Sequence, residues 1–166
     1  MDAVHSLGAW LPGTAASQFV NNHAWVWPAC ETLHFVGLIL LLGNIGLLDL
    51  RMLGLLKELP ARPFNQFVRW GVAGFVVNLA TGTVFFVGQP GQYIDNPSFY
   101  AKLVCIFLAG VNVVAFYATG VFRTVDSLAA GDDAPALAKF IAATSLVLWI
   151  GVMYFGRMLP YLGGAF

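Results

Sequence analysis

The chain has 166 residues, of which 59% are hydrophobic and only 10% charged, whereas an ordinary soluble domain carries roughly a quarter charged residues. Its eight basic and eight acidic residues cancel, so the charge gives no reason to expect a nucleic-acid partner. Cys30 and Cys105 both fall in apolar runs, which is typical of buried thiols and not of a disulfide framework. The composition therefore indicates a protein of the lipid bilayer.

The first 23 residues are too mixed in polarity to span a membrane. We predict that residues 1–23 form a short helix lying in the membrane interface, with Trp10 and Leu11 inserted into it. Lys and Arg are absent before Arg51, so no charged segment precedes an apolar one, as it would in a signal peptide. We therefore expect the first apolar run to direct membrane insertion itself.

Four apolar runs reach the length of about 20 residues that the hydrocarbon core of a bilayer requires. They cover about 24–49, 67–87, 99–122 and 137–161. Because the connections between them are short, neighbouring helices should run antiparallel. The sequence thus predicts an all-α membrane protein with one domain over residues 1–166, a four-transmembrane-helix antiparallel bundle preceded by a short N-terminal interfacial helix.

The basic residues predict the orientation of this bundle. Six of the eight Lys and Arg lie in or beside the loops at 51–66 and 124–136: Arg51, Lys57, Arg62, Arg69, Arg123 and Lys139. The other two, Lys102 and Arg157, fall within predicted spans. Because cytoplasmic loops carry an excess of Lys and Arg, we expect both loops in the cytoplasm and both termini in the periplasm.

This topology gathers ionisable and polar residues in the periplasmic half of the bundle. The set consists of Glu31 and His34 in the first run, Thr81 in the second, Lys102 in the third and Arg157 in the fourth. An ionisable group inside a membrane costs roughly 2–3 kcal/mol, so it normally faces a partner within the bundle. Gly37, one turn beyond His34, would allow close helix contact or leave room for a flat ligand.

Each member of this set also has a plainer explanation. Lys102 and Arg157 lie near helix ends, from which long cationic side chains commonly extend to the interface. The carboxylate of Glu31 could be satisfied at the first turn of its helix. His34 could make nothing more than an interhelical hydrogen bond to a Thr or Asn. The coincidence of four ionisable residues in one layer is what favours a functional site.

Haem b is the cofactor whose needs this layer meets. The sequence shows no nucleophile triad, paired carboxylates, phosphate-binding loop or Cys/His metal cage, and its four Met are too scattered for copper transport. His34 offers an axial ligand for the haem iron, the 14 Phe offer apolar walls, and Lys102 and Arg157 offer charges for two propionates. His23 and His34 would lie about 16 Å apart along a helix, too far to hold one iron.

Several motifs resemble an uncharacterised family of small bacterial inner-membrane proteins. They are Trp27-Pro28, Glu31, Leu33-His34, Gly37, Gly43 and Leu50-Arg51-Met52-Leu53-Gly54, with Thr81-Gly82, the Lys102 helix, Leu148-Trp149 and Gly156-Arg157 further along. More distantly, the chain is similar to copper-resistance D-type domains and to haem-dependent protoporphyrinogen oxidases. This resemblance implies that His34 is an axial haem ligand and that Lys102 is a site residue or the opposite ligand.

The chain also departs from those oxidases. Asn112 stands where they have a histidine after the lysine, and their C-terminal motif is missing. The resemblance therefore implies a haem site without implying the enzymatic activity.

We expect an integral protein of the bacterial inner (plasma) membrane that binds one b-type haem and exchanges electrons with a redox partner protein. Two alternatives stay open: a proton- or ion-coupled transporter or channel component that uses Glu31, His34 and Lys102, and a structural subunit without a cofactor. Helix faces rich in Gly and Phe are compatible with a homo-oligomer.

Overall fold

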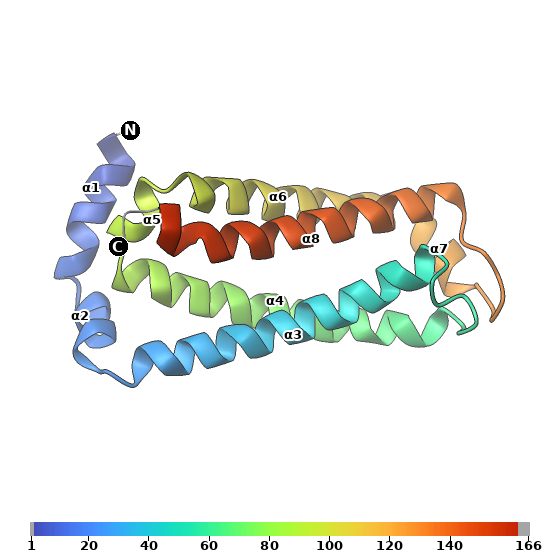
Figure 1. Ribbon diagram of the computed structural model, residues 1–166, viewed down its shortest axis with the longest axis horizontal. Coiled ribbons are helices and arrows are strands. Elements are labelled where there is room, and N and C mark those ends of the chain that lie inside the picture. The colour runs from blue at the N-terminus through green and yellow to red at the C-terminus, as the bar shows by residue number, and fades with distance from the viewer. Residues whose placement is uncertain (1, 163–166) are drawn as a thin grey trace.

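Four long helices form the body of the protein, which the computed structural model describes over residues 2–162, the side chains of residues 2 and 63–65 excepted (Figure 1). They are α3 (Val26–Met52), α4 (Arg62–Gly88), α6 (Pro97–Ala118) and α8 (Ala136–Leu162), and each runs antiparallel to the one before it. The described residues contain no strand. The predicted all-α, four-helix architecture is confirmed.

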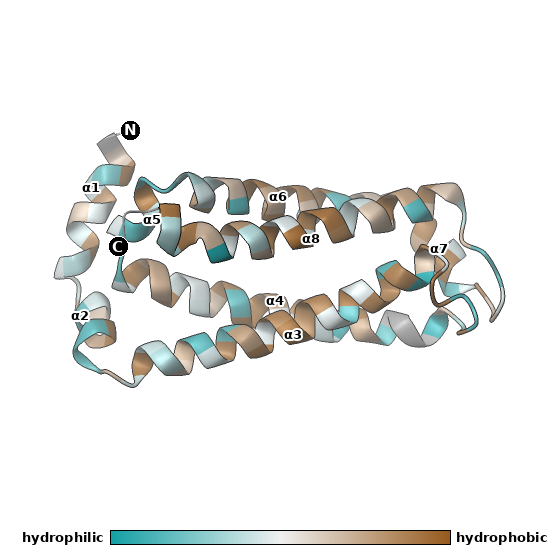
Figure 2. Cartoon of the chain, in the orientation of Figure 1, coloured by the Kyte–Doolittle hydropathy of each residue, from teal (hydrophilic) through white to brown (hydrophobic). Residues whose placement is uncertain are grey.

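All four long helices are long and apolar enough to cross a membrane. Their outward faces carry large apolar side chains, among them Ile39, Phe107, Phe140 and Val147, each 69–71% exposed. Exposure to water would cost about 25 cal/mol for each Å² of apolar surface, a cost that lipid removes. Hydrophobic colour accordingly dominates the long helices (Figure 2). This is the architecture of a multi-pass membrane protein.

The ends of α6 follow from local sequence. At its start Asn96 accepts a hydrogen bond from the Ser98 backbone N–H at 2.9 Å, and Pro97 occupies the first helical position, where a missing N–H is harmless. At its end Gly120 adopts a φ of +75°, which reverses the chain into the short helix α7 (Val121–Asp126). The predicted third span of 99–122 therefore begins two residues after α6 begins and ends four residues after α6 ends. Val121 is apolar because it packs in the protein core, and not because it faces lipid.

The predicted short helical segment at the N-terminus is present, and it is divided into two helices. Helices α1 (Asp2–Trp10) and α2 (Ala15–Asn22), joined by the 3₁₀ turn η1 (Leu11–Gly13), cross one end of the bundle (Figure 1). Asn21 fastens α2 to the end of α4 by donating to the Gly88 carbonyl oxygen at 2.9 Å. Trp10 is 65% exposed, but Leu11 is buried in the protein, so only Trp10 is free to contact lipid.

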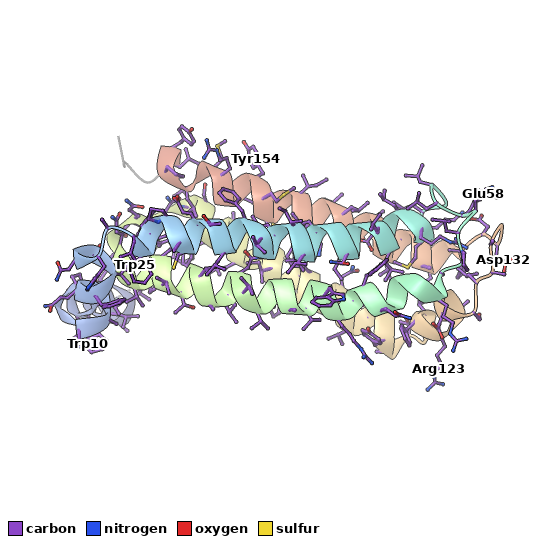
Figure 3. All side chains as sticks on the ribbon, turned by 90° about the horizontal axis from the view of Figure 1, so that it is seen from below. Trp10, Trp25, Glu58, Arg123, Asp132 and Tyr154 are labelled. Carbon is purple, nitrogen blue, oxygen red and sulfur yellow. The ribbon has the colours of Figure 1, made fainter. Side chains whose placement is uncertain are left out.

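The bundle is built from two helix pairs that meet mainly at one end. Helix α3 packs on α4 and α6 packs on α8, while the most extensive contact between the two pairs is between α3 and α8. The buried apolar core lies at the end that carries α7, and consists of Leu48, Met52, Ala61, Phe116, Val121, Val125, Ala134, Ala138, Ile141 and Ala142. We call this the basic-loop end, and Glu58, Arg123 and Asp132 all lie there, opposite Trp10 and Trp25 (Figure 3).

Arg51 ties the two loops of the basic-loop end together. It belongs to the last turn of α3 and not to a loop, and its side chain is fully buried. Its Nε donates to the Leu59 carbonyl oxygen at 2.6 Å, and its Nη2 donates to the Ala129 carbonyl oxygen at 3.0 Å. One side chain thus joins the α3–α4 loop to the loop between α7 and α8.

Candidate functional site

His34 lies on α3 and joins this helix to α4 in the half of the bundle that faces α1 and α2. Its Nδ1 lies 2.7 Å from the hydroxyl oxygen of Thr81, which is itself 5% exposed. The ring of Phe85, one turn further along α4, lies 5.6 Å from the imidazole, measured between centroids. The hydrogen bond is the interhelical contact that the plainer explanation of His34 predicts.

The hydrogen bonds of Thr81 favour one tautomer of His34. When the Thr81 hydroxyl donates its proton to its own helix, where the Val77 carbonyl oxygen lies at 2.8 Å and the Asn78 carbonyl oxygen at 3.3 Å, its oxygen accepts from His34 and the Nδ1 atom carries the imidazole proton. In a neutral imidazole the Nε2 atom then keeps a free lone pair, and within the described chain this atom has no hydrogen-bond partner. A histidine held this way through Nδ1 is prepared to bind a metal through Nε2.

Lys102 comes from the other helix pair and lies near this imidazole. Its side chain runs along α8 at Gly156, where a Cβ atom would lie 3.5 Å from the Lys102 Nζ. The ammonium is close enough to interact electrostatically with His34. The side chain is only partly exposed, and no hydrogen bond or ion pair to the described residues engages it. The site therefore holds a cation that is available to an anionic group.

Glu31 and Arg157 do not join His34 and Lys102. Glu31 is exposed, and its carboxylate accepts a hydrogen bond from the Trp27 Nε1 at 3.1 Å, one turn away on the same helix. Arg157 is exposed as well, with its guanidinium 5.8 Å from the ring centroid of Tyr161. The plainer explanation given above, a long cationic side chain extending toward the interface, fits this position of Arg157.

Gly37 serves helix packing. A Cβ atom at Gly37 would lie 2.9 Å from the Asn78 Nδ2 and 3.0 Å from the Gly74 carbonyl oxygen, so α3 and α4 touch at this level. Of the two roles that the sequence left open for Gly37, close helix contact is the one the geometry favours, because no room remains there for a flat ligand.

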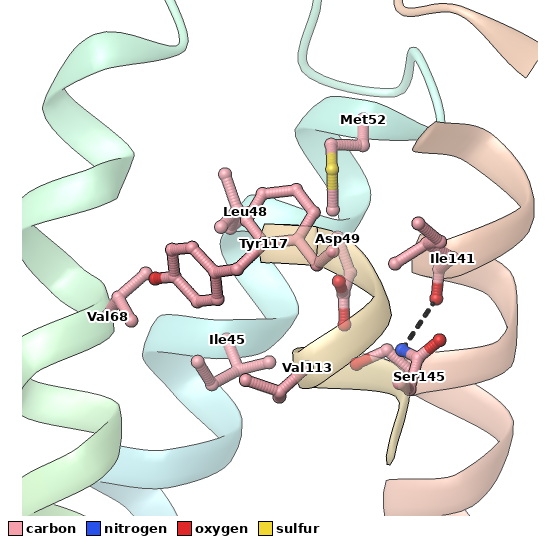
Figure 4. Close-up of a pocket in the computed structure, with 11 residues that line it drawn as sticks. Ile45, Leu48, Asp49, Met52, Val68, Val113, Tyr117, Ile141 and Ser145 are labelled. Carbon is pink, nitrogen blue, oxygen red and sulfur yellow. Dashed lines mark hydrogen bonds between the residues drawn. The ribbon is translucent and has the colours of Figure 1, made fainter. Parts of the chain in front are cut away.

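A second polar group, which the sequence analysis passed over, lies toward the basic-loop end. Asp49 of α3 is only 3% exposed, and its carboxyl group faces the Ser145 hydroxyl of α8, with which it interacts (Figure 4). An acidic side chain in the last turn of a helix usually reaches water, so the sequence alone gives no reason to expect Asp49 to be buried. Asn112 and Ser145, the polar residues that interrupt apolar stretches of α6 and α8, are the signal that could have found it.

Within the described residues no three His, Cys, Asp or Glu side chains gather closely enough to hold a bare metal ion. A haem differs in this respect, because the porphyrin supplies four ligands and the protein one or two. One imidazole and one nearby cation thus form a set that suits a haem better than an isolated ion.

Comparison with known proteins places the chain in a family. No curated protein and no solved structure matches it. One family model does match, over residues 23–162, which includes all four long helices and every residue of both polar groups. This match gives no support to the distant similarity to copper-resistance D-type domains and protoporphyrinogen oxidases. The chain therefore belongs to the family described as "Family of unknown function (DUF6644)".

Proposed function

We propose that the protein is an integral inner-membrane b-type haem protein that exchanges electrons with a redox partner. The observation that carries the proposal is the hydrogen bond between the His34 Nδ1 and Thr81, which leaves Nε2 free inside a membrane bundle. A histidine needed only for helix packing has no use for that second nitrogen, whereas an axial ligand requires it.

The surrounding residues fit a haem in composition. Phe85 contacts the imidazole, and Trp27 contacts Phe85 at 5.1 Å between ring centroids, so aromatic surface is at hand for a flat apolar ligand. The ammonium of Lys102 would hold a propionate or, after losing its proton, would serve as a ligand to the iron. When bound, haem b supplies one-electron redox chemistry.

Arg157 and Glu31 lie apart from His34, and their positions limit which residues could belong to the proposed haem site. Arg157 lies over Tyr161, so Lys102 is the cation we assign to the site. The transporter alternative needs Glu31, His34 and Lys102 in one layer, but the Glu31 carboxylate is held by Trp27 and is exposed. The separation of Glu31 from His34 and Lys102 therefore favours a haem site over an ion-transport site.

An absorption spectrum tests the proposal. We expect the protein, purified from cells supplied with a haem precursor, to show a Soret band and an α-band that appears on reduction. His34→Ala should lose the haem, as measured by the pyridine haemochrome assay. His5→Ala and His23→Ala are the matched controls and should retain it, because both residues are exposed at the end of the bundle. Absence of haem from the wild-type protein would overturn the function, and full haem content in His34→Ala would overturn the ligand.

A second variant separates the two roles of Lys102. Arginine keeps the positive charge but does not lose its proton in proteins, so it can pair with a propionate and cannot bind iron. If Lys102 pairs with a propionate, Lys102→Arg should keep the haem and its spectrum. If Lys102 binds iron, the same variant should lose the low-spin spectrum.

A further inference from the structure

Asp49 is a buried acid that has no cation partner among the described residues. Its side chain is 3% exposed, and its Oδ2 atom is buried without a hydrogen-bond partner. Arg51, two residues further along the same helix, donates to the carbonyl oxygens of Leu59 and Ala129 and does not pair with it. Among the described residues, the hydrogen-bonding group that interacts with the carboxyl group is the uncharged hydroxyl of Ser145.

A cavity of about 50 Å³ lies beside this carboxyl group. Its polar lining consists of Asp49, Tyr117, Ser145 and Asn112. The Asn112 Nδ2 donates to the Ile141 carbonyl oxygen at 3.0 Å. A buried water needs roughly 10–15 Å³ of such space and two or more polar partners, so the cavity has room for a few waters. Figure 4 shows the Asp49 carboxyl group directed toward Ser145, between α6 and α8.

The lining decides which ligand this carboxyl group can take. A carboxylate without a cation is costly in an apolar interior, and binding a proton or a cation removes the cost. A hard metal cation would need six or more oxygen ligands, whereas the other lining residues are apolar apart from Ser145, Asn112 and Tyr117, whose hydroxyl points toward Val68 (Figure 4). A proton needs one oxygen and leaves the apolar lining undisturbed.

We propose that Asp49, with Ser145 and the adjoining cavity, forms a proton-binding site inside the membrane that exchanges its proton with water at the basic-loop end. Among the residues that line the cavity from α3, α4, α6 and α8, the groups able to titrate are Asp49 and Tyr117. The site is independent of the haem proposal, because His34 and Asp49 are fifteen residues apart on α3, about 22 Å along the helix.

Infrared spectroscopy of the full-length protein in lipid vesicles at neutral pH tests this site. We expect a carbonyl stretching band from a protonated carboxylic acid, which Asp49→Asn removes. The matched control is Asp95→Asn, which replaces an exposed aspartate at the opposite end and should leave the band unchanged. Transfer into D₂O should shift the band to lower frequency, because the proton exchanges with solvent.

Ser145 gives a second test that does not depend on removing the acid. Ser145→Ala should shift the carbonyl band to higher frequency, since the carboxyl group loses its hydrogen bond, and Ser145→Thr should restore the wild-type position. The proposal is wrong if the wild-type protein shows no carboxylic acid band at neutral pH. The proposal is also wrong if the carbonyl band does not shift in D₂O, or if Ser145→Ala leaves the frequency of the band unchanged.

Discussion

Thr81 is a small residue whose hydrogen bonds influence the chemistry of the histidine beside it. Its hydroxyl lies 2.8 Å from the Val77 carbonyl oxygen, 3.3 Å from the Asn78 carbonyl oxygen and 2.7 Å from the His34 Nδ1. When the hydroxyl donates its single proton to its own helix, it accepts from His34. A threonine, which has a low helix propensity, therefore influences which imidazole nitrogen of His34 can bind a ligand.

Replacing Thr81 with valine should weaken haem binding without abolishing it. The variant keeps the shape of the side chain but removes the acceptor for the His34 Nδ1 proton, so the ring loses its fixed orientation. Loss of such an outer hydrogen bond typically lowers metal affinity by about 10–100-fold. A haem titration followed at the Soret band measures the change.

Two further variants make the Thr81 comparison specific. Thr81→Ser keeps the hydroxyl and should bind haem like the wild type. Thr83→Val removes an exposed hydroxyl that donates to the Leu79 carbonyl oxygen on the same helix, and should also have no effect. Equal affinities for Thr81→Val and Thr83→Val would contradict the role assigned to Thr81.

Among the elements, α3 and α4 form the closest pair, because two glycines face each other where they cross. A Cβ atom at Gly74 would lie 2.5 Å from the Gly37 carbonyl oxygen and 2.7 Å from the Leu41 backbone nitrogen. Both are backbone atoms of α3, which cannot move aside as a side-chain tip can. Close contact between glycines is a common way for membrane helices to associate.

We expect Gly74→Ala to lower the free energy of unfolding by about 1–3 kcal/mol, the usual range for overpacking a tight contact. Gly43→Ala on α3 is the control, because nothing lies within 4 Å of its would-be Cβ and alanine favours a helix. Thermal unfolding in detergent, followed by circular dichroism, compares the two. A Gly74 variant as stable as the Gly43 variant would mean that the helices do not meet this closely.

The start of α8 carries an exposed contact that depends on pH. The Lys139 Nζ donates to the Asp133 Oδ2 at 2.7 Å, and this hydrogen bond lowers the pKa of the Asp133 carboxyl below its ordinary value. A lowered pKa means that the contact is complete above about pH 4, where an unfolded aspartate is ionised, and is lost as the pH falls through the lower folded value. Acid should therefore release the 127–135 loop from the first turn of α8.

An NMR titration of the Asp133 carboxyl carbon measures this shift. Lys139→Gln should move the midpoint up toward the ordinary value for aspartate. Lys57→Gln should raise it less, because Lys57 acts on Asp133 through charge alone and contributes the weaker effect. An unchanged midpoint in Lys139→Gln would show that the contact does not persist in solution.

Sequence periodicity and length predicted the long helices well, because a bilayer demands about twenty apolar residues from any span. They predicted the end of α6 poorly. Val121 and Phe122 are as apolar as the residues of a membrane span, but they belong to α7, which follows the turn at Gly120. Apolar character alone cannot distinguish a residue that faces lipid from one that faces the protein core. The turn itself depends on a single positive φ angle.

The sequence also indicated how deep in the membrane each site residue lies. It did not indicate whether the side chain faces the interior of the bundle or its outer surface. His34, Lys102 and Arg157 were all expected in one layer, and the first two do lie near each other. Arg157 faces outward over Tyr161, because the rotation of α8 about its axis is set by packing along its whole length. Asp49 was missed for the same reason, since only the packing of α3 against α8 turns it inward.

For the whole molecule, the distribution of basic residues predicts which side faces the cytoplasm. Six of the eight Lys and Arg lie near the basic-loop end, where Arg123 is seen with Glu58 and Asp132 (Figure 3). Reporter fusions within 53–61 and 127–135 should therefore be cytoplasmic, and a fusion after Phe166, which lies outside the described residues, should be periplasmic. The reverse pattern would place His34 and Lys102 in the cytoplasmic half of the membrane.

The position of Arg51 has a consequence for the order of assembly during synthesis. Its first acceptor, the Leu59 carbonyl oxygen, is eight residues away and is present as soon as α3 and α4 emerge. Its second acceptor, on Ala129, is 78 residues away and arrives only when α6 and α7 have been made. Until then burial of the guanidinium would leave its Nη2 unsatisfied as well as its Nη1, which is buried without a hydrogen-bond partner in the folded protein, so exposure to water is favoured. Burial of Arg51 thus marks the moment at which the nascent second half joins the first, and a ribosome-bound chain truncated before Ala129 would leave this arginine open to solvent.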